Sequence, residues 1–225
     1  MMRILSLSLL WLMACSLTGA PTLRAAGTPS DAETAACAAF ELSNPHANAA
    51  VAAYWPPGTF DSDPNLDGFV RAWYSSQLCA MGEPRLAAPD SSDRTVVRFL
   101  WLRSFDPGIA IRATRASDTY QLTAIRLNGA GGYSPGSVDL RKERTLSASE
   151  WSRVSAALHR SNYWALPTSD RSNDGLDGSQ WIVEVVDGEQ YHVVDRRMGR
   201  DVAAIGKVLL ELARLESHDP TRNPR

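Results

Sequence analysis

The stretch TVVRFLWLRSFDPGIAIRA, residues 95–113, contains two runs, 97–101 and 109–113, with apolar side chains at every second position. Val97, Phe99 and Trp101 share this period, which places side chains on one face of a β-strand. The Asp-Pro-Gly sequence at residues 106–108 interrupts the pattern with residues typical of a tight turn. We therefore expect a β-hairpin here, and it sets the fold class of the chain.

The residues that follow this hairpin extend the sheet and then cover it. Ser147 and Glu150 have the spacing of a capping box at a helix start. Asp187 and Gly188 are a strong signal for a hairpin turn. The further strands that we expect cover residues 120–127, 137–144, 181–186 and 190–194, and the helices begin near residues 147 and 201. The order ββββαββα predicts an α+β domain over residues 95–216, with an antiparallel sheet of about six strands and helices on one side.

The part of the chain before this domain is rich in alanine and aromatic residues and predicts a small helical segment over residues 28–81. Its two helices are expected at residues 31–42 and 68–79. A linker or long loop is expected at residues 82–94, where Pro, Asp and Ser are frequent. The polar residues 217–225 are expected to form a flexible tail.

The first residues have the layout of a secretory signal. One charge at Arg3 precedes an uncharged, largely apolar run from Ile4 to Met13. This run of about ten residues is too short for a permanent membrane span, which needs roughly twenty. We expect a signal segment over residues 1–27 and export to the periplasm.

Two routes of signal removal remain open. Residues 12–15 resemble the lipobox of bacterial lipoproteins, in which Cys15 becomes the lipidated first residue and anchors the protein to the membrane. Small residues such as Ala25 and Gly27 instead fit cleavage by the ordinary signal peptidase. The lipobox favours the lipid anchor.

Loss or lipidation of Cys15 leaves two cysteines in an oxidising compartment. Cys37 and Cys79 can then form a disulfide that closes a loop of roughly forty residues. The alternative is a pair of buried free thiols.

Composition and motifs indicate no cofactor, no metal and no nucleic-acid partner. The chain has 23 basic and 25 acidic residues, so it lacks the positive charge of a nucleic-acid-binding protein. Its four histidines show none of the spacings of zinc sites. A phosphate-binding GxxxxGK sequence is also absent.

Two segments partly match the motifs of functional sites. Gly132, Ser134 and Gly136 match the GxSxG of a nucleophile elbow, but Pro135 has no N–H to donate to an oxyanion. Residues 63–68, DPNLDG, resemble the opening of a calcium loop whose closing position holds a tyrosine in place of glutamate. We interpret the first as a loop and the second as a turn that caps a helix.

A block of polar and aromatic residues in the second hairpin is the remaining candidate for a binding site. Its members are Trp181, Glu184, Tyr191, His192 and Arg196. A turn at residues 187–188 would place Glu184 opposite Tyr191. Because side chains alternate along a strand, Glu184 and His192 are expected on opposite faces, which argues against an acid–base pair.

The same block carries a resemblance to other proteins. The pattern DGxxWxxE from Asp177 to Glu184, followed by YHVVxR from Tyr191 to Arg196, resembles a group of uncharacterised exported proteobacterial proteins. The resemblance covers roughly residues 146–215. Arg197 and Met198 depart from the pattern. The resemblance implies that the chain belongs to this group, and it brings no known activity with it.

Together these features lead to two hypotheses about function. The first is a non-enzymatic binding, interaction or inhibitor-like module that meets an envelope protein or polymer. The second is a hydrolase of an envelope polymer that uses Glu184 with Asp174 or Asp177 on the preceding loop. Two carboxylates in one cleft would distinguish the second from the first.

Overall fold

The computed structural model of the chain describes residues 54–87, 93–132, 134–170 and 178–215. The signal segment, Cys15, Cys37, the helix expected at residues 31–42 and the tail lie outside the described residues. The same holds for Asp174 and Asp177. The predictions that depend on these residues therefore remain predictions.

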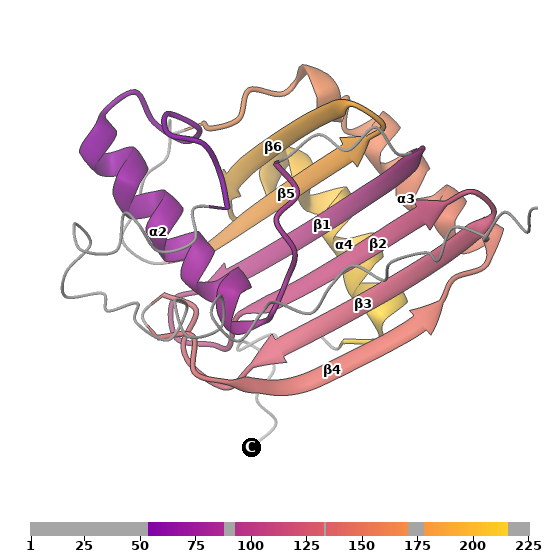
Figure 1. Cartoon of the computed structure of the whole chain (residues 1–225), viewed down its shortest axis with the longest axis horizontal. Helices are drawn as coiled ribbons and strands as arrows, with labels where there is room; N and C mark the ends of the chain where they lie inside the picture. The colour runs from indigo at the N-terminus through magenta and orange to yellow at the C-terminus, as the bar shows by residue number, and fades with distance from the viewer. Residues whose placement is uncertain (1–53, 88–92, 133, 171–177, 216–225) are drawn as a thin grey trace, which may run out of the picture.

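One antiparallel sheet of six strands forms the centre of the domain, in the order β4-β3-β2-β1-β5-β6 (Figure 1). The strands are β1 (Arg94–Arg103), β2 (Ile109–Ala116), β3 (Thr119–Leu127), β4 (Val138–Thr145), β5 (Ser179–Asp187) and β6 (Gln190–Arg197). Every pair of neighbours is antiparallel. The α+β class and the strand count are confirmed.

Strand β1 lies at the centre of the sheet and is buried on both faces. Eight consecutive residues between Arg94 and Arg103 are buried. Val97, Phe99 and Trp101 face one side, as their period of two predicts. Arg98, which alternates with them, is also fully buried on the opposite side. Both faces of the sheet must therefore be covered by other parts of the chain.

Two helices cover the face that carries Phe99. Helix α3 (Ala148–Arg160) begins at Ser147 with the expected capping box, in which Ser147 and Glu150 bond reciprocally. Hydrogen bonds from Arg144 are the main reason why the pKa of Glu150 falls to about 2. Helix α4 (Ala203–Ala213) follows the 3-10 turn η3 (Arg200–Val202). The apolar side of α4 packs on strands β1, β2, β3 and β5.

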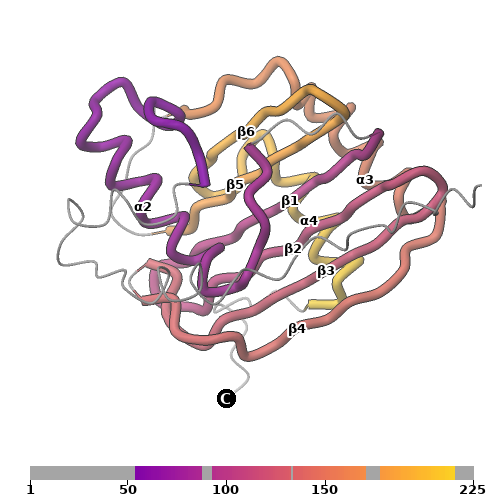
Figure 2. The backbone as a smooth tube through the Cα atoms, in the orientation of Figure 1, coloured from indigo at the N-terminus to yellow at the C-terminus, as the bar shows by residue number. Residues whose placement is uncertain are grey.

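Helix α2 (Pro64–Ala80) lies on the other face of the sheet, which makes the domain three layers thick (Figures 1 and 2). Asp63 caps it by accepting a hydrogen bond from the Asn65 backbone N–H. Tyr74 and Leu78 of α2 pack with Leu100 of β1 in one buried cluster. Residues 83–86, within the expected linker, are part of this layer, since Glu83 and Leu86 are buried.

The hairpin of β5 and β6 has a different register from the one predicted. Asp187 pairs with Gln190, so the turn residues are Gly188 and Glu189. Glu184 consequently faces Val193, and the expected pairing with Tyr191 was wrong. The shift is two residues, which preserves the face of every side chain.

The two edge strands of the sheet differ in how they are covered. Strand β4 is almost wholly exposed and carries acidic and basic residues from Asp139 to Arg144. Strand β6 bonds to the segment beside it, because the Asp195 N–H donates to the Thr168 carbonyl. Among the described helices, none has the length and apolar character needed to cross a membrane.

Candidate functional site

The five residues proposed as a binding site lie on two faces of the sheet. Glu184 and Tyr191 face α2, whereas Trp181, His192 and Arg196 face α3 and α4, or the segment that joins α3 to β5. The structure therefore does not bring the five together. Each of the five residues has its own set of contacts.

Glu184 lies in a buried network of hydrogen bonds. Its side chain is 1% exposed, and its Oε2 accepts from Arg98 Nε at 2.8 Å. The other oxygen, Oε1, accepts from Trp55 Nε1 at 3.0 Å and from the Tyr191 hydroxyl at 2.8 Å. Both carboxylate oxygens are thus engaged, and Glu184 offers no free base to a substrate.

A second carboxylate balances the charge of this network. Glu83 Oε2 lies 3.6 Å from Arg98 Nη1 and accepts from Arg112 Nε at 3.0 Å. The Tyr54 hydroxyl donates to the Glu83 backbone carbonyl at 2.6 Å. Burial raises the pKa of Tyr54 to about 12. Burial and the carboxylate of Glu184 likewise raise the pKa of Tyr191. Two acids, two arginines and neutral tyrosines form a structural core here.

His192 also has a structural environment. Its Nε2 lies 2.8 Å from the Leu166 carbonyl oxygen, so the ring donates this hydrogen bond. The ring lies roughly parallel to that of Trp164, with 6.3 Å between their centroids. The Tyr163 hydroxyl, 2.9 Å from the carbonyl oxygens of Val183 and His192, holds the same segment against β5 and β6.

Arg196 and Trp181 hold loops and helices in place. Arg196 is 1% exposed, and it donates to Asp201 Oδ2 at 3.0 Å and to the Pro167 carbonyl at 2.9 Å. Trp181 packs 4.9 Å from the Phe99 ring, centroid to centroid. Neither side chain has a free polar group directed into a cavity.

Both partial motifs have structural roles as well. Ser134 lies on a loop that leads into strand β4, where a nucleophile elbow would need a helix. Asp67 accepts from the backbone N–H groups of Gly58 and Phe60 and from Arg71, which occupies the carboxylate that calcium would need. In the described part of the chain, no group of three or more His, Cys, Asp or Glu side chains could hold a metal ion.

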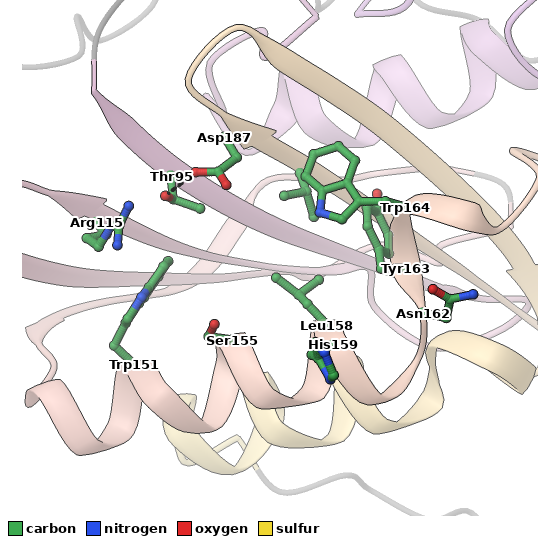
Figure 3. A pocket seen from close by; sticks show the side chains of 11 residues that line it. Thr95, Arg115, Trp151, Ser155, Leu158, His159, Asn162, Tyr163, Trp164 and Asp187 are labelled. Carbon is green, nitrogen blue, oxygen red and sulfur yellow. Dashed lines mark hydrogen bonds between the residues drawn. The ribbon is translucent and has the colours of Figure 1, made fainter.

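A cavity of about 380 Å³ lies between α3 and the sheet, and none of the five expected residues lines it (Figure 3). Its floor comes from β1, β2 and β5, and its walls from α3 and the 3-10 turn η2 (Tyr163–Ala165). The lining residues are Thr95, Arg115, Trp151, Ser155, Leu158, His159, Asn162, Tyr163, Trp164, Val185 and Asp187. This volume lies within the range of small-molecule sites.

The polar floor of the cavity is a row of three residues across neighbouring strands. Thr95 pairs with Arg115 on one side and with Asp187 on the other. The Thr95 hydroxyl donates to Asp187 Oδ1 at 2.7 Å. Arg115 is half-buried, and within the described residues no hydrogen bond or ion pair engages its guanidinium. The cavity therefore combines an available cation with aromatic walls.

Sequence reasoning missed this cavity because its residues come from distant parts of the chain. Trp151 belongs to α3, and Tyr163 and Trp164 belong to η2, far along the chain from Thr95 of β1. Arg115 closes the alternating pattern of β2, which is the one local signal that marks it as facing the helices. The register that joins it to Asp187 could not be read from a single strand.

Compared with known proteins, the chain matches no family model and no curated protein sequence.

Proposed function

We propose that the mature domain is a non-enzymatic binding module of the bacterial envelope whose ligand enters the cavity beneath α3. The observation that carries this proposal is the unengaged guanidinium of Arg115 in a cavity that the rings of Trp151, Tyr163 and Trp164 also line. A concave site with apolar walls and few polar groups is typical of ligand recognition. The hydrolase hypothesis gains no support from Glu184, because both its carboxylate oxygens are bound inside the core.

The cellular location belongs to the same proposal. The signal segment and the lipobox favour a periplasmic protein that a lipid at Cys15 anchors to the membrane. Its partner would be an envelope component, either a protein or a fragment of a polymer. A cavity of this size accepts only a small molecule or a short protruding segment of a larger partner.

A pair of variants on α3 tests the proposal. Ser155 lines the cavity and is exposed, so Ser155→Trp should fill it without disturbing the core. Ser152 is exposed on the same helix outside the cavity, and Ser152→Trp is the matched control. Immobilised mature protein is incubated with envelope extract, and the retained molecules are identified by mass spectrometry.

We expect wild type and Ser152→Trp to retain a common set of molecules that Ser155→Trp does not retain. Thermal melts of both variants should remain close to that of wild type, because both positions are at the surface. Identical retention by all three proteins would refute binding at this cavity.

A further inference from the structure

The floor of the cavity separates two opposite charges by a fixed distance. Arg115 and Asp187 lie on the two strands that flank β1, and both pair with Thr95. Neighbouring strands are about 4.8 Å apart, so the two backbones are separated by roughly 10 Å. Figure 3 shows the two side chains on the sheet side of the cavity, with Trp151 rising from α3 toward the sheet.

Each of the two charged groups has unused bonding capacity. The Arg115 guanidinium carries five N–H donors, and none is engaged within the described residues. Asp187 uses Oδ1 to accept from Thr95, while Oδ2 accepts no hydrogen bond from any described residue. Arg115 and Asp187 do not form an ion pair with each other, although Thr95 connects them. A ligand that carries both charges could satisfy the two groups at once.

We infer that the cavity binds a compact zwitterion of dipeptide size, with its carboxylate on Arg115, its ammonium on Asp187 and an apolar side chain against the Trp151–Leu158 wall. This inference rests on the function proposed above. An arginine fork matches a carboxylate in bidentate geometry. Two extended residues span about 7 Å, which fits between the ends of an arginine and an aspartate whose backbones are roughly 10 Å apart.

A singly charged ligand fits the cavity less well. A simple organic anion would meet Arg115 but would be repelled by Asp187 at the other end of the row. A simple amine would be attracted by Asp187 but repelled by Arg115. The arrangement therefore discriminates by charge separation as well as by size.

The test uses alanyl-phenylalanine and two blocked forms of it with the mature protein. N-acetylation removes the ammonium charge, and conversion of the C-terminus to an amide removes the carboxylate. Binding is followed by NMR through the indole N–H signals of Trp151 and Trp164, which line the cavity. We expect the free dipeptide to shift both signals, and each blocked form to bind roughly tenfold more weakly, as loss of one charge-assisted hydrogen bond implies.

Two charge variants assign each end of the ligand to one residue. In Arg115→Gln, the amide should bind as well as the free acid, while N-acetylation should still weaken binding. In Asp187→Asn, the reverse should hold. The matched controls are Arg160→Gln at the exposed end of α3 and Glu189→Gln in the hairpin turn, because both residues are exposed and neither lines the cavity. Both controls should behave as wild type.

Equal binding of the free and blocked forms, or a wild-type pattern in both charge variants, would overturn the inference. So would the absence of any shift of the two indole signals. If envelope molecules are still retained by wild type and lost in Ser155→Trp, only the ligand class is wrong and the binding module remains. If that retention is absent too, both proposals fail.

Discussion

The guanidinium of Arg98 and the carboxylate of Glu184 pair across strands β1 and β5, with 0% and 1% of their side chains exposed. Removing one partner of a buried pair leaves the other charge uncompensated. We therefore expect Glu184→Gln to lower the free energy of unfolding by about 3–5 kcal/mol, measured by chemical denaturation. Replacing both partners, as Arg98→Met with Glu184→Leu, should recover much of this loss.

The control for this prediction is a pair at the surface. Arg126 and Asp139 are 43% and 42% exposed, so Asp139→Asn should cost less than about 1 kcal/mol. A Glu184→Gln protein as stable as wild type would mean that the buried network around Arg98 and Glu184 does not stabilise the packing of the α2 layer on the sheet.

Trp181 fills the space above Gly206, and the two residues should be energetically coupled. A Cβ at residue 206 would lie 2.4 Å from Cζ3 of Trp181. Trp181→Ala should cost about 3–5 kcal/mol, since a large buried ring is lost. Gly206→Ala should cost about 1–3 kcal/mol by overpacking, and less in a Trp181→Leu background. Strictly additive losses in a double-mutant cycle would contradict this contact.

Asp67 should contribute to stability in a pH-dependent way. Burial alone would raise its pKa, but hydrogen bonds from the Phe60 and Gly58 backbones and from Arg71 lower it below 3.8. A lowered folded-state pKa means that the contribution is present above the unfolded-state pKa and is lost as pH falls through the folded-state pKa. Asp67→Asn should therefore destabilise most at pH 7 and progressively less below pH ~4.

Denaturation curves of wild type and Asp67→Asn between pH 7 and pH 2 check this dependence. Asp118→Asn, in the exposed turn between β2 and β3, is the control and should show a small difference that hardly changes with pH. A constant difference for Asp67→Asn would show that its ionisation does not support the loop before α2.

The disulfide between Cys37 and Cys79 remains a prediction, since Cys37 lies outside the described residues. Cys79 is buried in α2 at 7% exposure. We expect mature protein isolated without reductant to resist maleimide labelling at both positions after denaturation. Reduction should lower stability by about 4 kcal/mol, because the bridge constrains a long loop of the unfolded chain. Labelling of both thiols in the unreduced protein would refute the bridge.

Lipidation of Cys15 also remains a prediction. Cys15→Ala should abolish labelling by a radioactive fatty acid and move the protein from the membrane fraction to the soluble periplasmic fraction. Cys37→Ser is the control and should leave fractionation unchanged. Unaltered processing of Cys15→Ala would favour the ordinary signal peptidase, with cleavage nearer Ala25 or Gly27.

The strands and the two C-terminal helices could be predicted because their signals are local. The alternation around Phe99 and the capping box at Ser147 each depend on residues within a few positions. The burial of Arg98 was not predicted, although a strand with apolar residues on both faces is typical of the centre of a sheet. Arg98 is the one arginine within the buried stretch of β1, which indicates a buried partner, and only the register with β5 identifies this partner as Glu184.

The candidate site was predicted less well than the fold. The turn predicted at Asp187 and Gly188 lies one residue later, at Gly188 and Glu189. Gly188, with its positive φ of 58°, is therefore the first turn residue and not the second. Residues 95, 115 and 187 meet only after three strands have paired. Tertiary pairing of this kind leaves no periodic signal in a single sequence.

The charged outer strand β4 affects how the protein behaves when many copies are crowded together. An open strand edge can recruit a strand from another molecule and so begin aggregation. Lys142 and the charged residues on either side of it would have to be stripped of water for such a strand to pair. Copies concentrated on one surface should therefore remain separate, whereas substituting apolar residues along β4 would turn the same sheet into a template for fibres.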